Sequence, residues 1–276
     1  MTARASCLIG WPAAHSRSPI IHKYWLKSFG IDGDYRIEAV KPEDFEGFVA
    51  RLAERGYTGA NVTLPHKEMA LKVADADDRA RAVGAANTLW FDGGRLRATN
   101  TDVEGFVASL DASAPGWDKA DEALVLGAGG AARAVLFGLI ERGFKTIHLA
   151  NRTLPRAEQL ARHFGPSVRP APWDRVTQLL PRASLLVNTT SLGMKGQPPL
   201  EIDLKPLPST AIVSDVVFIP LHTPLLQAAV ARGLQTADGL GMLLHQAVRG
   251  FSLWFGKRPT VTTELRALVE ADLART

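Results

Sequence analysis

The chain has 276 residues, of which 46% are hydrophobic and 22% charged, and its formal net charge at pH 7 is +4. These are ordinary values for one large or two medium globular domains. The lysines and arginines are scattered among acids, and no dense basic run with interleaved aromatic residues occurs. This pattern excludes a nucleic-acid-binding surface as the main function and favours anionic small molecules as ligands.

Cysteine usage and hydropathy bear on the compartment. Cys7 is the only cysteine, so no internal disulfide can form, and its apolar neighbours predict a buried, unreactive thiol. Residues 1–15 lack the apolar core of a signal peptide, and no apolar run approaches the length of about 18 residues that a membrane span needs. We therefore expect a cytoplasmic protein that does not bind membranes.

The first part of the chain alternates between strand and helix patterns, which is typical of an α/β domain. The strands are short apolar runs, the helices repeat apolar residues along one face, and two adjacent glycines predict a hairpin. The expected strands begin at residues 5, 35 and 59, the hairpin turns at 92–94, and the expected helices begin at Pro19, cover 42–55, 68–73 and 78–83, and begin again at Asp102.

Residues 112–121 are small, polar and proline-bearing, and they predict a connection to a second alternating segment. There the expected strands are 123–126, 145–150, 184–187, 211–217 and 234–237, and the expected helices carry Ala134 to Leu139 or cover 155–164, 238–255 and 260–274. Residues 166–172 are expected to form a turn, and 197–208 a loop that can move over a ligand.

The segment from Ala123 to Thr153 predicts a dinucleotide-binding unit, because it combines a strand, a glycine turn, a helix and a second strand. Gly127 permits the tight turn and Gly129 lets the backbone approach a pyrophosphate, which the helix N-terminus attracts. A turn that merely needs positive φ is the alternative, but the flanking strand and helix favour the cofactor site.

The end of the second strand favours NADP over NAD. NAD enzymes usually have an acid there for the ribose hydroxyls. This chain has Asn151, Arg152 and Thr153, followed by Arg156, and these groups suit the 2′-phosphate. The alternative is that Thr153 caps the next helix and that the arginines are ordinary solvated charges.

Three other polar segments could bind a ligand, although each also has a purely structural interpretation. Ser16 and Ser18 precede a helix and could hold a carboxylate, but Ser18 could also serve only as an N-cap. Lys67 follows a strand, where α/β sheets collect ligands, but could be a surface lysine. Asp102 opens a helix and could cap it or take part in catalysis.

Seven motifs in order extend over most of the chain, and with them it resembles the shikimate dehydrogenases. They are HSRSP at 15–19, NVTLPHK at 61–67, AANT at 85–88, TNTD at 99–102, GAGGAARA at 127–134, NRT at 151–153 with Arg156, and DGLGMLLHQA at 238–247.

The resemblance implies a reversible, NADPH-dependent reduction of 3-dehydroshikimate to shikimate, in the biosynthesis of aromatic amino acids. It also implies an α/β fold of two domains separated by a cleft: a substrate domain of residues 1–103, completed by helices within 241–276, and a Rossmann-like NADP domain of residues 104–240. The expected protein is a monomer or homodimer that binds its small-molecule substrate without a metal ion.

The resemblance also implies site residues. Lys67 would be the acid/base residue, with Asp102 beside it. Ser16 and Ser18 would bind the substrate carboxylate. The ring hydroxyls of the substrate would be bound by Thr63, Asn87, Asp102 and Gln246. The cofactor contacts would be Asp78, Gly127, Ala128, Gly129, Gly130, Ala131, Asn151, Arg152, Thr153, Arg156, Val216 and Gly239.

One residue departs from the family pattern. Phe218 stands near the substrate carboxylate where the family usually has a tyrosine, so one hydrogen bond of about 0.5–1.5 kcal/mol would be lost. A quinate/shikimate or aminoshikimate dehydrogenase with altered substrate preference is therefore an alternative, although an NAD-dependent one should carry an acid near Asn151. A methylenetetrahydrofolate dehydrogenase would not need the HSRSP and NTD motifs, and Lys67 and Asp102 argue against a catalytically silent cofactor sensor.

Overall fold

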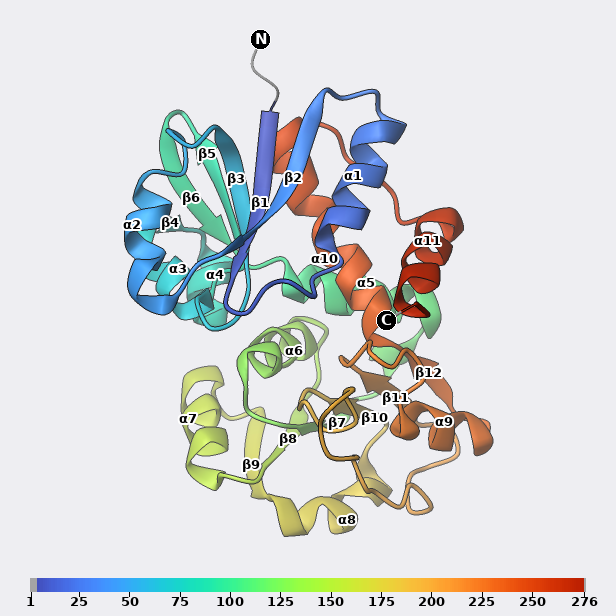
Figure 1. Ribbon diagram of the computed structural model, residues 1–276. Helices are drawn as coiled ribbons and strands as arrows, with labels where there is room; N and C mark the ends of the chain where they lie inside the picture. Colours follow the sequence, from blue (N-terminus) through green and yellow to red (C-terminus); the bar gives the residue numbers. More distant parts are fainter. Residues whose placement is uncertain (1–3, 276) are drawn as a thin grey trace. The chain divides into compact units, whose positions relative to one another are not determined.

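The structure, a computed structural model, describes residues 4–275 (Figure 1). Its contacts divide into two compact units, one with the residues up to Asp102 and those from Leu244 onward, the other with Val103–Leu243. The division thus falls within helix α5 (Asp102–Ser113) and helix α10 (Gly239–Phe255). The boundaries expected from the sequence, after residues 103 and 240, fall within the same two helices.

The sheet of the first unit has the strand order β2-β1-β3-β5-β6-β4. Strand β1 is parallel to β2 and β3, whereas β5 is antiparallel to both β3 and β6. The strands are β1 Arg4–Gly10, β2 Gly33–Ala39, β3 Tyr57–Val62, β4 Asp75–Ala76, β5 Thr88–Asp92 and β6 Arg95–Thr99. The helices are α1 Ser18–Ser28, the 3-10 helix η1 Pro42–Asp44, α2 Phe45–Ala50, α3 Lys67–Val73, α4 Asp78–Val83 and α11 Thr263–Leu273.

The helix expected over 42–55 is shorter in the structure. It begins as η1, continues as α2 and ends at Ala50, after which turns lead to Gly56. Leu52 is fully buried in these turns, and its carbonyl accepts the Tyr57 N–H at the start of β3. The apolar spacing was therefore a sound guide to burial but not to the end of the helix.

One core of the first unit packs alternate residues of β1, among them Cys7, against α2. Cys7 is fully buried, and burial raises the pKa of its thiol, so the expected inert cysteine is confirmed.

A second cluster of the first unit consists of aromatic side chains around His22. The imidazole stacks on Tyr35 at a centroid distance of 4.1 Å and lies 5.4 Å from the ring of Trp254. His22 is fully buried, and burial lowers its pKa to about 3, an effect that the nearby Asn61 side chain only partly opposes.

Acid should therefore destabilise the protein through His22. In the unfolded chain His22 is protonated below about pH 6.5, whereas in the folded chain it stays neutral down to about pH 3. The free energy of unfolding therefore decreases as the pH is lowered through this window. Between pH 6.5 and 4.5 the free energy of unfolding should drop by about 2–3 kcal/mol more in the wild type than in a His22→Phe variant. Urea titrations at both pH values measure this difference. Equal drops in the two proteins would contradict the prediction.

The sheet of the second unit is parallel throughout, in the order β12-β11-β10-β7-β8-β9. Counted from β7, this is the 3-2-1-4-5-6 order of dinucleotide-binding domains, with the reversal between β7 and β10. The strands are β7 Glu122–Leu126, β8 Thr146–Asn151, β9 Val168–Pro172, β10 Leu185–Asn188, β11 Ile212–Asp215 and β12 Gln235–Ala237. The expected α/β class, with a Rossmann-like domain, is confirmed.

The helices of the second unit cover both faces of this sheet. Alternate residues of β7 face two different cores: Val125 packs with α6, whereas Leu124 packs with α9. The helices are α6 Gly130–Glu141, α7 Leu154–Phe164, α8 Val176–Leu179, α9 Pro224–Ala231 and the 3-10 helices η2 Trp117–Lys119, η3 Trp173–Arg175 and η4 Leu180–Arg182. Helix α9 and the helical turns after β9 were not predicted.

The turn expected over 166–172 is wrong, because most of this segment forms β9. The strand pairs in parallel with β8 and is the last strand on its side of the sheet. Pro170 and Pro172 cannot donate to a neighbouring strand, and an edge position tolerates that loss. The prolines therefore mark an edge strand rather than a turn.

Candidate active site

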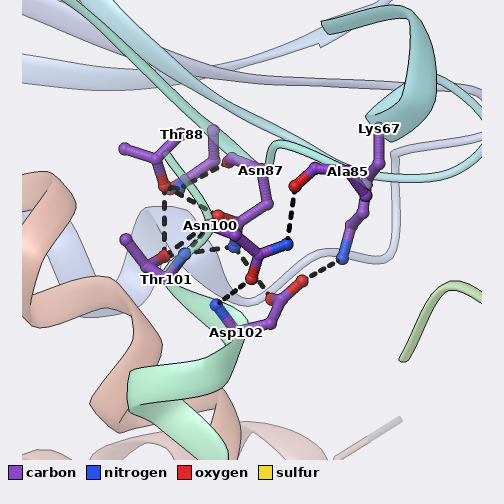
Figure 2. A network of polar contacts seen from close by, with 8 residues as sticks. Lys67, Ala85, Asn87, Thr88, Asn100, Thr101 and Asp102 are labelled. Carbon is purple, nitrogen blue, oxygen red and sulfur yellow. Dashed lines mark hydrogen bonds and ion pairs between the residues drawn. The ribbon is translucent and has the colours of Figure 1, made fainter. Parts of the chain in front are cut away.

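Two charged side chains that are distant in the sequence meet in the first unit (Figure 2). The Lys67 Nζ lies 2.6 Å from Asp102 Oδ2 and donates a hydrogen bond to it. Lys67 is the first residue of α3, which follows β3, and Asp102 is the first residue of α5, which follows β6. Both side chains are largely shielded, with 17% and 10% of their areas exposed. The ion pair is therefore held at the edge of the unit's interior.

The residue before Lys67 fixes the start of α3. The imidazole Nε2 of His66 donates to the Val40 carbonyl at 2.8 Å, and the ring stacks on Phe45 at a centroid distance of 4.6 Å. The Lys67 carbonyl in turn accepts the Ala86 N–H at 2.9 Å. The backbone of Lys67 is thereby anchored on two sides, so the freedom of the ammonium group is limited to its side chain.

Asp102 uses both carboxylate oxygens. Its Oδ1 accepts from Asn87 Nδ2 at 2.8 Å, while Oδ2 accepts from Lys67. The Asn87 Oδ1 accepts the Thr101 N–H at 2.7 Å, and the Asp102 N–H donates to Asn100 Oδ1 at 3.1 Å. As Figure 2 shows, the AANT and TNTD motifs form one network that sets the direction of the carboxylate.

Further buried polar groups support this network, and the sequence alone did not single them out. The Tyr35 hydroxyl donates to Asn61 Oδ1 at 2.7 Å. The Asn61 Nδ2 donates to the Asn87 carbonyl and to Thr88 Oγ1. Burial raises the pKa of Tyr35 well above its ordinary value, so the hydroxyl stays a donor. The sequence signal that could have revealed this network was Asn61, an amide near the end of an apolar strand, because a buried amide side chain needs hydrogen-bond partners.

The other substrate residues implied by the resemblance lie in the same unit. Ser16 Oγ donates to Ser18 Oγ at 3.2 Å, and Ser18 is the first residue of α1. The side chain of Thr63 lies so close to Gly10 that a Cβ built there would be 2.4 Å from its Cγ2, so glycine is required. Gln246 is buried within α10.

The glycine turn of the second unit connects β7 to α6. Gly127 has φ of +98°, and a Cβ there would lie 2.7 Å from Thr190 Cγ2. Gly129 is different, because a Cβ built on it meets nothing within 4 Å. A side chain there would instead occupy the open space in front of the α6 N-terminus. This is the cradle that an anionic group needs at such a turn.

Asn151 ties the glycine turn to the loop after β8. Its Oδ1 accepts the Ala128 N–H at 3.1 Å, and its Nδ2 donates to the Thr153 carbonyl at 2.8 Å. The side chain of Thr153 makes no capping hydrogen bond to α7. Arg152 and Arg156 are exposed, and within residues 4–275 neither guanidinium forms an ion pair. The alternative in which Thr153 serves as a side-chain cap is thus not supported.

Val216 and Gly239 also lie together in the second unit. A Cβ on Gly239 would be 2.3 Å from the Val216 carbonyl oxygen, so the helix α10 can begin there only with glycine. Asp215 is buried beside them and accepts from Asn188 Nδ2, the Val217 N–H and Thr223 Oγ1. Burial raises the pKa of Asp215 despite these three donors.

Two other expectations fall on more exposed positions. Phe218 is partly buried in the second unit, after β11. Asp78 is the first residue of α4 in the first unit, where its exposed carboxylate pairs with Arg81. No group of three or more histidine, cysteine or acidic side chains in the described part of the chain is arranged to hold a metal ion. No helix among the described residues is both long and apolar enough to span a membrane.

Family models match three parts of the chain. The shikimate dehydrogenase substrate-binding domain matches residues 8–89, the shikimate/quinate 5-dehydrogenase model matches residues 113–194, and the shikimate 5′-dehydrogenase C-terminal domain matches residues 239–263.

Close relatives and solved structures cover nearly the whole chain. A shikimate dehydrogenase (NADP+) from Nitrobacter winogradskyi is 68% identical over 272 residues, which are 99% of this chain and 98% of the relative. A shikimate 5-dehydrogenase from Thermus thermophilus, in complex with NADP(H) and shikimate, is 35% identical with a TM-score of 0.85 over 99% of each chain. A quinate dehydrogenase from Corynebacterium glutamicum, in complex with NAD, is 30% identical with a TM-score of 0.91 over 98% of this chain and 99% of that one.

The parallel sheet with its glycine turn, together with the lysine–carboxylate pair, defines a two-domain NAD(P)-dependent oxidoreductase. The matches above identify the family within that class. The chain belongs to the shikimate dehydrogenase (NADP+) family.

Proposed function

We propose that the protein reversibly reduces 3-dehydroshikimate to shikimate with NADPH and that Lys67 is its acid/base residue. The observation that carries this assignment is the 2.6 Å contact between Lys67 Nζ and Asp102 Oδ2 within a buried polar network. The family membership supports the reaction and the cofactor.

The chemistry of the pair fits this reaction. Reduction of a ketone develops negative charge on its oxygen, and a proton donor within hydrogen-bond reach lowers that barrier. The Lys67 ammonium can donate this proton, and its neutral amine can take one back in the reverse direction. Asp102 holds the ammonium in position and offers its own carboxylate as an acceptor for a substrate hydroxyl. The bound nicotinamide supplies the hydride.

The remaining substrate contacts are proposed for side chains of the same unit. Ser16 and Ser18 bind the carboxylate, and their neighbouring hydroxyls support this role because a carboxylate accepts two hydrogen bonds at once. Thr63, Asn87 and Gln246 bind the ring hydroxyls. The buried Asn87 supports this role because its amide is already oriented by Thr101 and Asp102.

Most cofactor residues are proposed because their arrangement in the second unit suits the phosphate groups of NADP. The open space at Gly129 and the α6 N-terminus suit a pyrophosphate, which the backbone from Gly127 to Ala131 would hold. Arg152 and Arg156, with Thr153, suit the 2′-phosphate because both guanidiniums are exposed. Asn151, Val216 and Gly239 complete the proposed set in this unit, Asn151 mainly by fixing the loop. Asp78 of the first unit is proposed on the motif resemblance alone.

Loss of Arg152 should change the preference between cofactors. Arg152→Ala removes a guanidinium from the proposed 2′-phosphate site, so KM for NADP+ should rise about 10-fold while KM for NAD+ stays the same. Arg162→Ala is the matched control, since Arg162 is an exposed arginine on α7, the helix that follows Arg152. Initial rates at varied cofactor concentration measure both constants. An unchanged preference for NADP+ in Arg152→Ala would contradict the proposed role of Arg152 in binding the 2′-phosphate.

The assembly and the compartment are proposed more briefly. The protein is expected to be a monomer or homodimer, which light scattering of the purified chain tests. A cytoplasmic location is supported by the free, buried Cys7, because a reducing compartment keeps thiols in this form.

A direct assay separates the proposed reaction from its alternatives. Formation of NADPH from NADP+, or of NADH from NAD+, is followed by absorbance with shikimate or quinate as substrate. The proposed function requires the shikimate and NADP+ pair to give the highest kcat/KM. Preference for quinate and NAD+ would favour the activity named for the Corynebacterium glutamicum protein. The absence of turnover with all four pairs would instead favour a cofactor-binding sensor.

A further inference from the structure

One ion pair connects the loop that carries Ser16 and Ser18 to the last helix of the chain. The Arg17 Nε lies 2.6 Å from Asp272 Oδ2, and Arg17 is buried, with 8% of its area exposed. The Arg17 Nη1 also donates to the His15 carbonyl at 2.8 Å. One guanidinium therefore ties its own loop to α11.

Both charges stand at helix ends that do not favour them. Arg17 is the N-cap residue of α1, where the helix dipole disfavours a cation. Asp272 lies in the last turn of α11, where the dipole disfavours an anion. Asp272 also lies 3.7 Å from Arg275, but that guanidinium is exposed, whereas Arg17 is the buried partner at 2.6 Å. The contact between Arg17 and Asp272 thus offsets two charges that their own helix dipoles disfavour. Local choices that oppose their own element often mark a tertiary or functional requirement.

Helix α11 is also anchored to α1 near its other end. The Tyr24 hydroxyl lies 3.4 Å from Thr262 Oγ1, and the Trp25 Nε1 donates to the Thr260 carbonyl at 3.3 Å. Thr262 is itself the N-cap of α11 and accepts the Leu265 N–H. With both ends of α11 attached to α1 or to the residue before it, α11 is a rigid support for Arg17.

We propose that Asp272 is a positioning residue for substrate binding, which acts by holding Arg17 and thereby the geometry of Ser16 and Ser18. This inference rests on the proposed function, in which the two serines receive the substrate carboxylate. The serine hydroxyls lie 3.2 Å apart on either side of Arg17, so movement of that residue changes the distance between them.

The test compares three variants of α11 by steady-state kinetics with shikimate and NADP+. Asp272→Asn removes the charge, and Asp272→Glu keeps it. Glu270→Gln is the matched control, because Glu270 pairs only within the helix, with Arg266 at 2.8 Å among the described contacts. In Asp272→Asn, KM for shikimate should rise about 10-fold, while kcat and KM for NADP+ stay within about twofold of the wild type. Asp272→Glu should recover most of the loss, and Glu270→Gln should behave as the wild type.

Shikimate methyl ester provides the readout that a general loss of stability would not change. The ester lacks the carboxylate, so its KM should be the same in the wild type and in Asp272→Asn. An equal rise of KM for acid and ester, or no rise for the acid, would overturn the positioning role. If Asp272→Asn does not fold, Asp272→Glu with the two substrates gives the same comparison, with a smaller rise that is still confined to the acid. Failure of the wild type to oxidise shikimate would instead overturn the proposed function.

Discussion

Replacement of Lys67 by alanine should lower kcat by about 10²- to 10⁴-fold, while KM for shikimate changes little. The substitution removes the proposed proton donor but leaves the serines and Asn87 in place. His66 and Ala86 anchor the backbone at this position, so α3 should still begin there. Single-turnover kinetics with 3-dehydroshikimate and NADPH, followed by absorbance, measure the loss in the chemical step.

Two further measurements show whether the loss reflects proton transfer. Lys72→Ala is the matched control, because Lys72 is an exposed lysine on the same helix, and it should keep wild-type kcat. A small primary amine added to Lys67→Ala should restore part of the rate, in proportion to the amine's protonated fraction. A kcat loss of only a few-fold in Lys67→Ala would mean that another group provides the proton.

Asp102→Asn should have the second largest effect, a fall in kcat/KM of roughly 100-fold. Both carboxylate oxygens accept from N–H donors, Lys67 on one side and Asn87 on the other. An asparagine offers a single acceptor, so its NH₂ group must face one of these donors. A buried donor left without an acceptor costs about 1–3 kcal/mol, and the lost charge adds to this.

The comparison for Asp102→Asn uses an acid outside the network. Asp75→Asn is suitable because Asp75 is 46% exposed and pairs with Arg81 and Arg97. This variant should keep kcat/KM within about twofold, since exposed ion pairs contribute little. Thermal melting of both variants separates loss of folding from loss of activity. Wild-type kcat/KM in a folded Asp102→Asn protein would remove Asp102 from the catalytic site.

The sequence predicted the Rossmann-like unit well because its signals are local. The apolar residues before Gly127 form a buried strand. Gly127 itself has a positive φ, which glycine adopts more readily than other residues. The structures of residues 166–172 and of helix α9 were harder to predict. The prolines of β9 report only a missing donor, and whether that means a turn or an edge strand depends on the neighbouring strand.

The proposed catalytic pair, Lys67 and Asp102, was less predictable from the residues alone. By spacing, Lys67 could be a surface lysine and Asp102 a helix cap, because no periodicity reports a contact between residues 35 positions apart. The motif resemblance singled out both residues, and the structure brings them together. Tyr35 and Asn61 remained unnoticed, since their hydrogen bond depends on the register of two neighbours of β1. Arg17 was not singled out either, because a charged residue in a polar loop is normally expected to be exposed to solvent.

The double attachment of Asn151 limits how this protein could be re-engineered for another coenzyme. Installing an acid at the end of β8, as NAD enzymes have, would most simply begin with Asn151→Asp. The aspartate could still accept the Ala128 N–H, but it would turn an oxygen toward the Thr153 carbonyl, which now receives a hydrogen bond. A redesign should therefore leave Asn151 intact and alter Arg152, so that the change in selectivity does not loosen the glycine turn proposed to bind the pyrophosphate.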